Sequence, residues 1–354
     1  MKKLYIYYFV LLNVFYVSSQ NIEDDMIIIE DESNSKLVKA QKAYNIGIEA
    51  FKNDMFAEAE EAFSKAISVM DTFHLAYYNR AGARHRQGKH ELAIKDYSFA
   101  IDHLPHLNSY YGRSLIYLDL KQFDKALEDL DKQIKLDSEH ALSYYTKGLV
   151  FFQQEKYEKA INEFTKAIEI NSKLAQAYHD RASAHRMSTN IDTALLDYEK
   201  ALEIDPNNSF YKNSYGSALR INGDLYKAVY QFNKVIEKDK NNITALNSRG
   251  RIYLEQQKYR EAIDDFNQVI KLNSQNAFAY NNKANALFYL KKYDEAITLY
   301  NKALQFDHEY GVAYLNRGIS YEMMRKSSQA CSDWRKAEEL GIKNATSYIS
   351  NNCN

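Results

Sequence analysis

Residues that form turns are scarce in this sequence. Its 354 residues include only two prolines and eleven glycines, the residues that most often interrupt helices and strands. Charged residues make up 26% of the chain and hydrophobic residues 45%, proportions typical of a folded protein with amphipathic elements. The composition excludes long irregular segments and predicts one body of mainly regular secondary structure.

The sequence also lacks the signatures of common enzyme classes. It contains no glycine-rich phosphate loop, no HExxH zinc motif, no nucleophile elbow and no CxxC pair. The histidines form one local cluster, which consists of His85, His90, His103 and His106. A zinc site needs three or four ligands that converge on one point, and scattered surface histidines are the simpler interpretation. We predict no catalytic residues, no metal and no cofactor, and hence no enzyme.

Strong charge of one sign and further long apolar runs are missing as well. The 46 basic and 47 acidic residues nearly cancel, so neither nucleic acid nor an anionic membrane is an expected partner. Beyond the N-terminal run described next, no segment approaches the roughly 18 apolar residues of a membrane-spanning helix. We therefore expect no integral membrane segment in the mature chain.

The N-terminus has the three parts of a secretory signal peptide. Lys2 and Lys3 make its start basic, residues 4–17 form an almost uninterrupted apolar run, and residues 17–19 suit a cleavage site. We predict a signal peptide over residues 1–19, cleavage near Ser19/Gln20, and a secreted or periplasmic mature chain. A membrane anchor helix is the alternative, but the apolar run is too short to span a bilayer comfortably.

A pattern of apolar and small residues recurs every 34 residues from about Ala40 to the C-terminus, with one interval of 33. An alanine near the start of the second helix marks each repeat: Ala59, Ala93, Ala126, Ala160, Ala194, Ala228, Ala262, Ala296 and Ala330. A fixed period of this length indicates a solenoid, in which each repeat buries its apolar face against its neighbours. Nine repeats begin near residues 40, 74, 107, 141, 175, 209, 243, 277 and 311.

Each repeat contains two apolar stripes with helical spacing, which predict two antiparallel helices. In the fourth repeat the stripes comprise Tyr144, Gly148 and Phe151, then Tyr157, Ala160, Phe164 and Ala167. A small residue recurs where the two helices must approach closely: Gly47, Ala81, Gly148, Ala182, Gly216, Gly250, Ala284 and Gly318. Pro105 and Pro206 both follow a second helix, where proline ends a helix at little cost.

By these residues the repeats resemble tetratricopeptide repeats, whose signature has aromatics at positions 4, 11 and 24, a small residue at 8 and alanines at 20 and 27. The resemblance covers residues 40–342. It implies an all-α, right-handed superhelical solenoid of nine helix-turn-helix repeats, and we expect a C-terminal capping helix over 343–354. The third repeat (Ser114, Leu130, Gln133) and the sixth (Lys212, Val235) depart from the signature and should pack less regularly. The last repeat, residues 330–341, resembles that of secreted Bacteroidetes members.

An acidic segment over residues 20–39 precedes the repeats. Its carboxylates flank the apolar residues 26–29, and such a composition is typical of a flexible leader. The alternative is that residues 27–29 dock into the N-terminal part of the array as a cap or a ligand in cis.

Cys331 and Cys353 are the only cysteines, 22 residues apart. In an oxidising compartment they form a plausible disulfide that pins the end of the array. A loop of this size would contribute about 3 kcal/mol in the chain-entropy model. Two unpaired cysteines are the alternative, and a metal-binding or catalytic role is disfavoured.

A charged pair recurs with a fixed spacing of 16 residues. Position 7 is basic and position 23 acidic in Arg80/Asp96, Arg113/Asp129, Lys147/Glu163, Arg181/Asp197, Arg249/Asp265 and Arg317/Asp333, and the first and sixth repeats lose both members. We predict an ion pair that holds the two helices of a hairpin in register, in preference to a role in ligand binding. If exposed, each pair would contribute only about 0–1 kcal/mol.

The resemblance further implies that the first helices line a concave groove, chiefly through positions 2, 5, 9, 12 and 13. Repeats 1–4 present Tyr44, Tyr78, Tyr111 and Tyr145 at position 5. Repeats 5–8 present His179, Asn213, Asn247 and Asn281 there, with Arg251 and Asn285 at position 9 and Arg186 and Arg220 at position 12. One half of the predicted groove is therefore aromatic and the other polar and cationic.

These twelve residues predict a groove for an extended peptide. Tyrosines offer rigid contact area, asparagines can bond to a peptide backbone, and arginines can pair with carboxylates. The alternative is that the same residues contact a neighbouring helix. The carboxylate clamp known from related proteins is absent, because only Asn79 and Arg251 match it at isolated positions.

The sequence thus predicts a secreted scaffold or adaptor that binds a protein or peptide partner, possibly in envelope or secretion-complex assembly. The alternative is a structural array that acts by self-association or spacing without a discrete ligand. Groove mutations would distinguish the two, since only the first function depends on groove residues.

Overall fold

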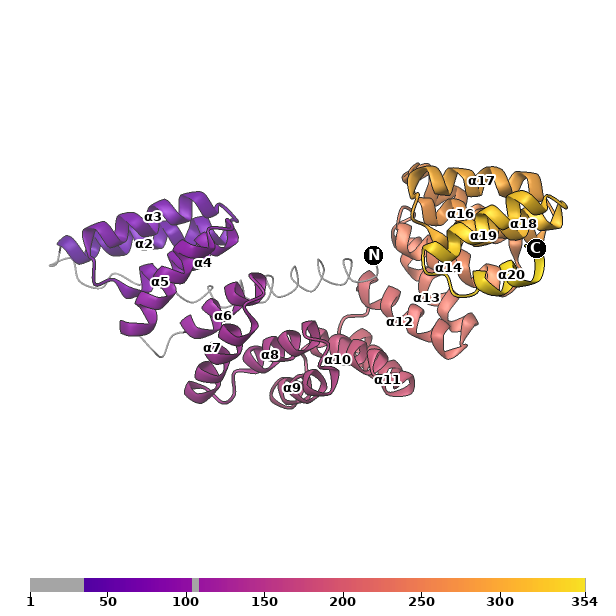
Figure 1. Ribbon diagram of the computed structural model, residues 1–354. Coiled ribbons are helices and arrows are strands. Elements are labelled where there is room, and N and C mark those ends of the chain that lie inside the picture. The colour runs from indigo at the N-terminus through magenta and orange to yellow at the C-terminus, as the bar shows by residue number, and fades with distance from the viewer. Residues whose placement is uncertain (1–34, 104–107, 354) are drawn as a thin grey trace. The chain divides into compact units, whose positions relative to one another are not determined.

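The computed structural model describes residues 35–103 and 108–353, and every regular element in these ranges is a helix (Figure 1). The predicted signal peptide and residues 20–34 of the predicted leader lie outside the described residues. The remaining leader residues, 35–39, belong to the first described helix, so the repeats begin earlier than predicted. No helix in the described ranges is both long enough and apolar enough to cross a bilayer.

The chain divides into two compact units, residues 1–204 and 205–354. The described part of the first unit contains five helix pairs. Their bounds are α2 (Ser35–Lys52) with α3 (Phe56–Val69), α4 (His74–Arg86) with α5 (His90–His103), α6 (Ser109–Asp119) with α7 (Phe123–Leu136), α8 (Ala141–Gln153) with α9 (Tyr157–Ile170), and α10 (Ala175–Met187) with α11 (Ile191–Ile204).

The second unit contains four helix pairs and a terminal helix. Their bounds are α12 (Ser209–Asn222) with α13 (Leu225–Lys238), α14 (Ile243–Glu255) with α15 (Tyr259–Leu272), α16 (Ala277–Tyr289) with α17 (Tyr293–Phe306), α18 (Gly311–Met323) with α19 (Ser327–Glu339), and α20 (Ala345–Asn352). The predicted helical hairpins and the predicted C-terminal helix are therefore present. Within each unit the pairs form a helical repeat solenoid, as predicted.

Close contact between a small residue and an aromatic ring sets the distance between the helices of a pair. A Cβ atom added to Gly148 would lie 2.5 Å from the ring of Phe164, and one added to Gly250 would lie 2.9 Å from the ring of Phe266. All nine marker alanines are fully buried. In the third repeat, Leu130 replaces the aromatic ring, and it is buried together with Ser114.

The turn between the two helices of each repeat contains one residue with positive φ. Glycine occupies this position only at Gly88 and Gly223, whereas seven repeats have another residue: Asp54, Lys121, Glu155, Thr189, Gln257, Lys291 and Arg325. An L-residue in this left-handed region costs about 1 kcal/mol or more. The packing of the hairpins therefore holds these residues in an unfavourable conformation.

The recurrent charged pairs connect the two helices of a repeat, as predicted. In five of the six pairs, both a guanidinium Nε and Nη2 donate to one aspartate, as in Arg249 to Asp265 at 2.9 and 2.6 Å. The hydrogen bonds to Asp265 raise the pKa of Arg249 although burial opposes this. The remaining Nη1 donates to the second helix of the preceding repeat, here to Asn233 at 2.7 Å. The arginine thus connects two repeats, which the sequence analysis missed.

The exception is the pair with lysine and glutamate. Lys147 donates to Asp131 at 2.6 Å and lies 3.9 Å from Glu163. A lysine has a single charged nitrogen and cannot bind a carboxylate and the preceding repeat with a planar fork, as arginine does. The paired aspartates are buried, with 3–8% of the side chain exposed, so the estimate for exposed pairs does not apply to them.

A second polar cluster connects the first two repeats. Glu60 accepts hydrogen bonds from Arg84 at 2.8 Å, Lys89 at 2.7 Å and Gln87 at 3.0 Å. Burial by itself raises the pKa of Glu60, but these three donors together outweigh it and lower the pKa to about 2 from 4.5. The cluster favours the ionised carboxylate in the folded chain.

The stability that Glu60 provides should therefore depend on pH. Because its folded pKa lies below its unfolded value, its contribution is present above pH 4.5 and disappears as the pH falls towards 2. We expect Glu60→Gln to lower the midpoint of thermal unfolding at pH 7, and the difference from the unchanged protein to shrink below pH 4.5. The exposed neighbour Glu61 supplies the control, Glu61→Gln. A difference that stays constant down to pH 3 would contradict this assignment.

The C-terminal end is held by a disulfide bond. Cys331 on α19 is bonded to Cys353, which follows α20. Trp334 on α19 is fully buried and stacks on Tyr348 of α20 with ring centroids 5.1 Å apart. The bond and the stacked rings together fix α20 against the last repeat, as the sequence predicts.

Breaking this bond should loosen α20. The chain-entropy model gives about 3 kcal/mol for the 22-residue loop. We expect reduction of the protein to increase amide exchange in α20 about 100-fold, with little change in α12. The variant Cys331→Ala/Cys353→Ala should behave like the reduced protein. Unchanged protection of α20 after reduction would show that packing alone holds the helix.

Candidate peptide-binding groove

The first helices of the second unit form one face. Successive first helices α12, α14, α16 and α18 contact one another, and we call the surface formed by positions 5, 9 and 12 of these helices the first-helix face. Its predicted ligand-binding residues are Asn213, Arg220, Asn247, Arg251, Asn281 and Asn285. The first unit contributes the other six, on α2, α4, α6, α8 and α10.

Five of the twelve predicted groove residues are buried between repeats and are not available to a ligand in this structure. They are Tyr44, Tyr111, Tyr145, His179 and Asn281, each with at most 4% of its surface exposed. Burial raises the pKa of Tyr111 to about 12. The prediction of an aromatic groove in repeats 1–4 is therefore wrong, and the alternative of contact with a neighbouring helix applies.

Hydrogen bonds between adjacent repeats explain this burial. A residue at position 5 pairs with the residue at position 6 of the next repeat, 35 residues later. The pairs are Tyr44 with Asn79 at 2.7 Å, Tyr145 with Asp180 at 2.7 Å and Asn281 with Asn316 at 3.2 Å. His179 contacts Asp180 at 2.8 Å. Position 5 thus stabilises the stacking of repeats through polar side chains placed between first helices.

The other seven predicted residues are partly exposed. Tyr78 and Arg186 lie in the first unit, and Asn213, Arg220, Asn247, Arg251 and Asn285 lie in the second. Arg186 lies near Tyr198, whose pKa is raised by burial and lowered by the charge of Arg186. Asn285 accepts a hydrogen bond from Tyr300 at 2.6 Å. The polar part of the prediction therefore remains possible only in part, and chiefly in the second unit.

Arg220 and Arg251 differ in their partners. Arg220 donates to Glu255 at 2.7 Å, so this charge is largely compensated. Arg251 forms no hydrogen bond or ion pair in the part of the chain that the structure describes, and its guanidinium lies 5.7 Å from the centroid of the Phe278 ring. Burial lowers the pKa of Arg251, and the charge of Arg220 lowers it further. A half-buried cation in such surroundings is well placed to pair with a carboxylate.

Two amide oxygens on the same face also lack a donor. Asn213 Oδ1 and Asn247 Oδ1 are buried atoms without a hydrogen-bond partner among the described residues. Asn247 lies one helical turn before Arg251 on α14, so both side chains point to the same side of the helix. A buried acceptor without a donor costs about 1–3 kcal/mol. A peptide N–H group could satisfy each of these oxygens.

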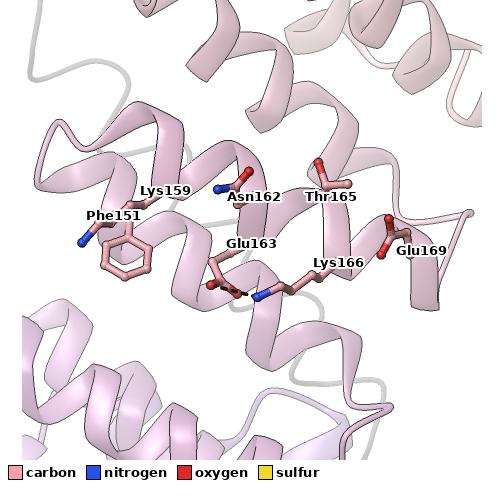
Figure 2. Close-up of a pocket in the computed structure, with 7 residues that line it drawn as sticks. All are labelled: Phe151, Lys159, Asn162, Glu163, Thr165, Lys166 and Glu169. Carbon is pink, nitrogen blue, oxygen red and sulfur yellow. Dashed lines mark hydrogen bonds and ion pairs between the residues drawn. The ribbon is translucent and has the colours of Figure 1, made fainter.

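A shallow depression lies elsewhere, on the second helix of the fourth repeat. It has a volume of about 430 Å³ and is lined by Phe151, Lys159, Asn162, Glu163, Thr165, Lys166 and Glu169. Figure 2 shows Glu163 and Lys166 joined by an ion pair, which spans 3.4 Å. Sequence reasoning missed this depression because it considered only first-helix positions. Its open, mixed-charge surface has no group aligned for catalysis, and we assign it no function.

Comparison with known families agrees with this architecture. Models described as tetratricopeptide repeats match residues 44–103 and 247–310, residues 107–140, and residues 148–187, which together exceed half of the chain. The chain belongs to the tetratricopeptide repeat family. A model of the anaphase-promoting complex, cyclosome, subunit 3, matches residues 187–269. Tetratricopeptide repeat proteins are typically non-enzymatic scaffolds for protein–protein interaction.

Three solved structures show the same fold. A tetratricopeptide repeat protein from Parabacteroides merdae is 20% identical with a TM-score of 0.52, and the match covers 71% of this chain and 99% of that one. PilF of Pseudomonas aeruginosa is 20% identical with a TM-score of 0.51, over 60% and 97%. The Cut9–Hcn1 hetero-tetramer structure matches at 14% identity and a TM-score of 0.56, over 98% and 82%. At these identities the similarity concerns the fold alone.

Proposed function

We propose that this tetratricopeptide repeat protein is a secreted adaptor that binds an extended, acidic peptide segment on the first-helix face of its second unit. In this role it would help to assemble an envelope or secretion complex. The observation that carries the proposal is Arg251, a half-buried cation without a carboxylate partner among the described residues. Asn247 and Asn213 supply unpaired acceptors on the same face.

The chemistry of these groups defines the ligand. A carboxylate of the peptide would pair with Arg251, and peptide N–H groups would donate to the two asparagine oxygens. Because Glu255 already neutralises Arg220, Arg251 is the better target for mutation. This narrows the groove predicted from sequence to one part of the second unit.

The test is selection of binding sequences from a random 12-residue peptide library with the purified chain. We expect acidic peptides to be enriched, with micromolar affinity that weakens as salt rises. Arg251→Glu should weaken binding at least about 30-fold, since it removes one charge-assisted pair and adds repulsion. Arg335→Glu, on the exposed side of α19, makes the same change in net charge and should leave binding unchanged.

Two results would overturn the proposal. One is that no peptide is enriched, and the other is that both variants bind enriched peptides as the unchanged protein does. The second result, together with association of the chain at micromolar concentration, would favour the structural array. Secretion is tested separately by N-terminal sequencing of the protein from fractionated cells, for which the expected first residue is Gln20.

A further inference from the structure

Three potential metal ligands meet where the second and third repeats join. They are His85 near the end of α4, His90 at the start of α5 and Asp119 at the end of α6. One ligand atom of each residue lies within 4.8 Å of those of the other two. The three helices belong to the first unit, and α5 contacts both α4 and α6 (Figure 1).

The cluster is partly shielded from solvent. The side chain of His85 is 6% exposed and that of Asp119 is 15% exposed, and His85 Nε2 lies 2.7 Å from Asp119 Oδ2. The rings of His85 and His90 have centroids 5.7 Å apart. His90 Nδ1 is buried and has no hydrogen-bond partner among the described residues. One imidazole nitrogen is therefore available at the site without the loss of an existing hydrogen bond.

We propose that His85, His90 and Asp119 bind a divalent transition-metal ion, with zinc as the best match. Two imidazoles and one carboxylate form a ligand set that suits zinc and related ions, whereas calcium and magnesium prefer oxygen ligands alone. Zinc–ligand distances of about 2.1 Å in a tetrahedron place ligand atoms about 3.4 Å apart. The atoms of His85 and Asp119 would need to separate by less than about 1 Å.

Three protein ligands leave a fourth position for water. His85 also lines a small cavity of about 40 Å³ together with Asn79 and Tyr111, which is large enough for a water molecule. Asn79 Oδ1 is buried there without a partner among the described residues. Water from this cavity or from the surface would complete the coordination. The ion would then connect the second and third repeats in addition to their packing.

This site corrects the analysis of the histidine cluster from sequence. Only two of the four clustered histidines take part, because His103 stacks on His74 and Phe99 instead, and His106 lies outside the described residues. Asp119 was missed because it lies 34 residues beyond His85. The register predicts the contact, since position 12 of one repeat faces position 13 of the next, as Arg220 and Glu255 also show.

The test is zinc binding by the untagged, chelator-treated chain, followed by calorimetry and by the visible absorption of added Co²⁺. We expect one ion per chain. His90→Gln should weaken binding at least about 100-fold, because loss of a direct ligand exceeds the 10–100-fold cost of losing an outer-shell partner. Asp119→Asn should have a similar effect. His103→Gln is the matched control in the same repeat and should bind zinc as the unchanged protein does.

His90→Gln is the decisive variant because His90 makes no hydrogen bond through its buried nitrogen, so its fold should persist. Circular dichroism checks that the helix content is unchanged. The proposal is wrong if the unchanged chain binds less than half an equivalent of zinc at 10-fold excess over about 10 µM protein. It is also wrong if His90→Gln and Asp119→Asn bind zinc as tightly as His103→Gln, in which case His85 and Asp119 form only a hydrogen-bonded pair.

Discussion

Replacing Asp265 with alanine should lower the local stability of α14 and α15 by about 3–5 kcal/mol. The change leaves the Arg249 guanidinium in a largely buried site without the carboxylate that binds both of its nitrogens. Loss of one member of a buried pair has a cost of this size because the remaining charge is not compensated. Amide hydrogen exchange is the suitable measurement, since repeats of a solenoid can open separately. Exchange in α14 and α15 should accelerate at least about 100-fold.

The neighbouring Asp264 provides a control, because it lies on the exposed side of α15. Asp264→Ala should change exchange in these helices less than about 3-fold. The double variant Asp265→Ala/Arg249→Met should recover part of the lost protection, since it removes the buried charge together with its partner. If the double variant exchanges faster than Asp265→Ala alone, the arginine stabilises the hairpin chiefly through Asn233 and the preceding repeat.

Replacing Phe164 with alanine should destabilise the fourth repeat by about 3–5 kcal/mol. The ring is fully buried and fills the space opposite Gly148, to which no side chain can be added without a shift. Since Gly148 has no side chain that could fill the cavity, the site cannot collapse easily. Urea unfolding of the first unit and amide exchange in α8 and α9 measure the effect. Leu196→Ala, at a site 64% exposed, should change stability by less than about 0.5 kcal/mol.

A converse substitution checks the same contact. Gly148→Ala would place a Cβ 2.5 Å from Phe164, whereas a Cβ at Gly82 would meet its nearest atom at an ordinary 3.5 Å. Gly82→Ala should therefore be neutral or stabilising, because alanine favours helix, and Gly148→Ala should destabilise. Equal effects of the two changes would mean that the hairpins adjust their spacing freely and that Phe164→Ala is less costly than expected.

The repeat architecture could be predicted from sequence because it depends on local period. The predicted repeat starts at 74, 141, 175, 209, 243, 277 and 311 coincide with the first residues of α4, α8, α10, α12, α14, α16 and α18. The charged pairs followed from the same period, since a fixed spacing of 16 residues places both members on facing helices. The disulfide followed from the count of cysteines.

The candidate site could be predicted only in part, because periodicity does not distinguish a residue between two repeats from a residue on the open face. Tyr145 and Asn281 occupy position 5 and are buried by the next repeat, whereas Asn247 at the same position is partly exposed. The difference depends on whether the next repeat offers a polar partner at position 6. The left-handed turn residues were also missed, since residues such as Glu155 do not favour that conformation.

The buried indole of Trp334 gives this protein an internal optical probe. It is the only tryptophan of the chain, and it lies in the last repeat beside Tyr348 and the disulfide. Its emission therefore reports the environment of one terminal hairpin, whereas circular dichroism sums over all helices. The separation between the two unfolding curves would measure how far cooperativity extends along the array. Emission that changes before ellipticity would show that unfolding begins at the C-terminal end.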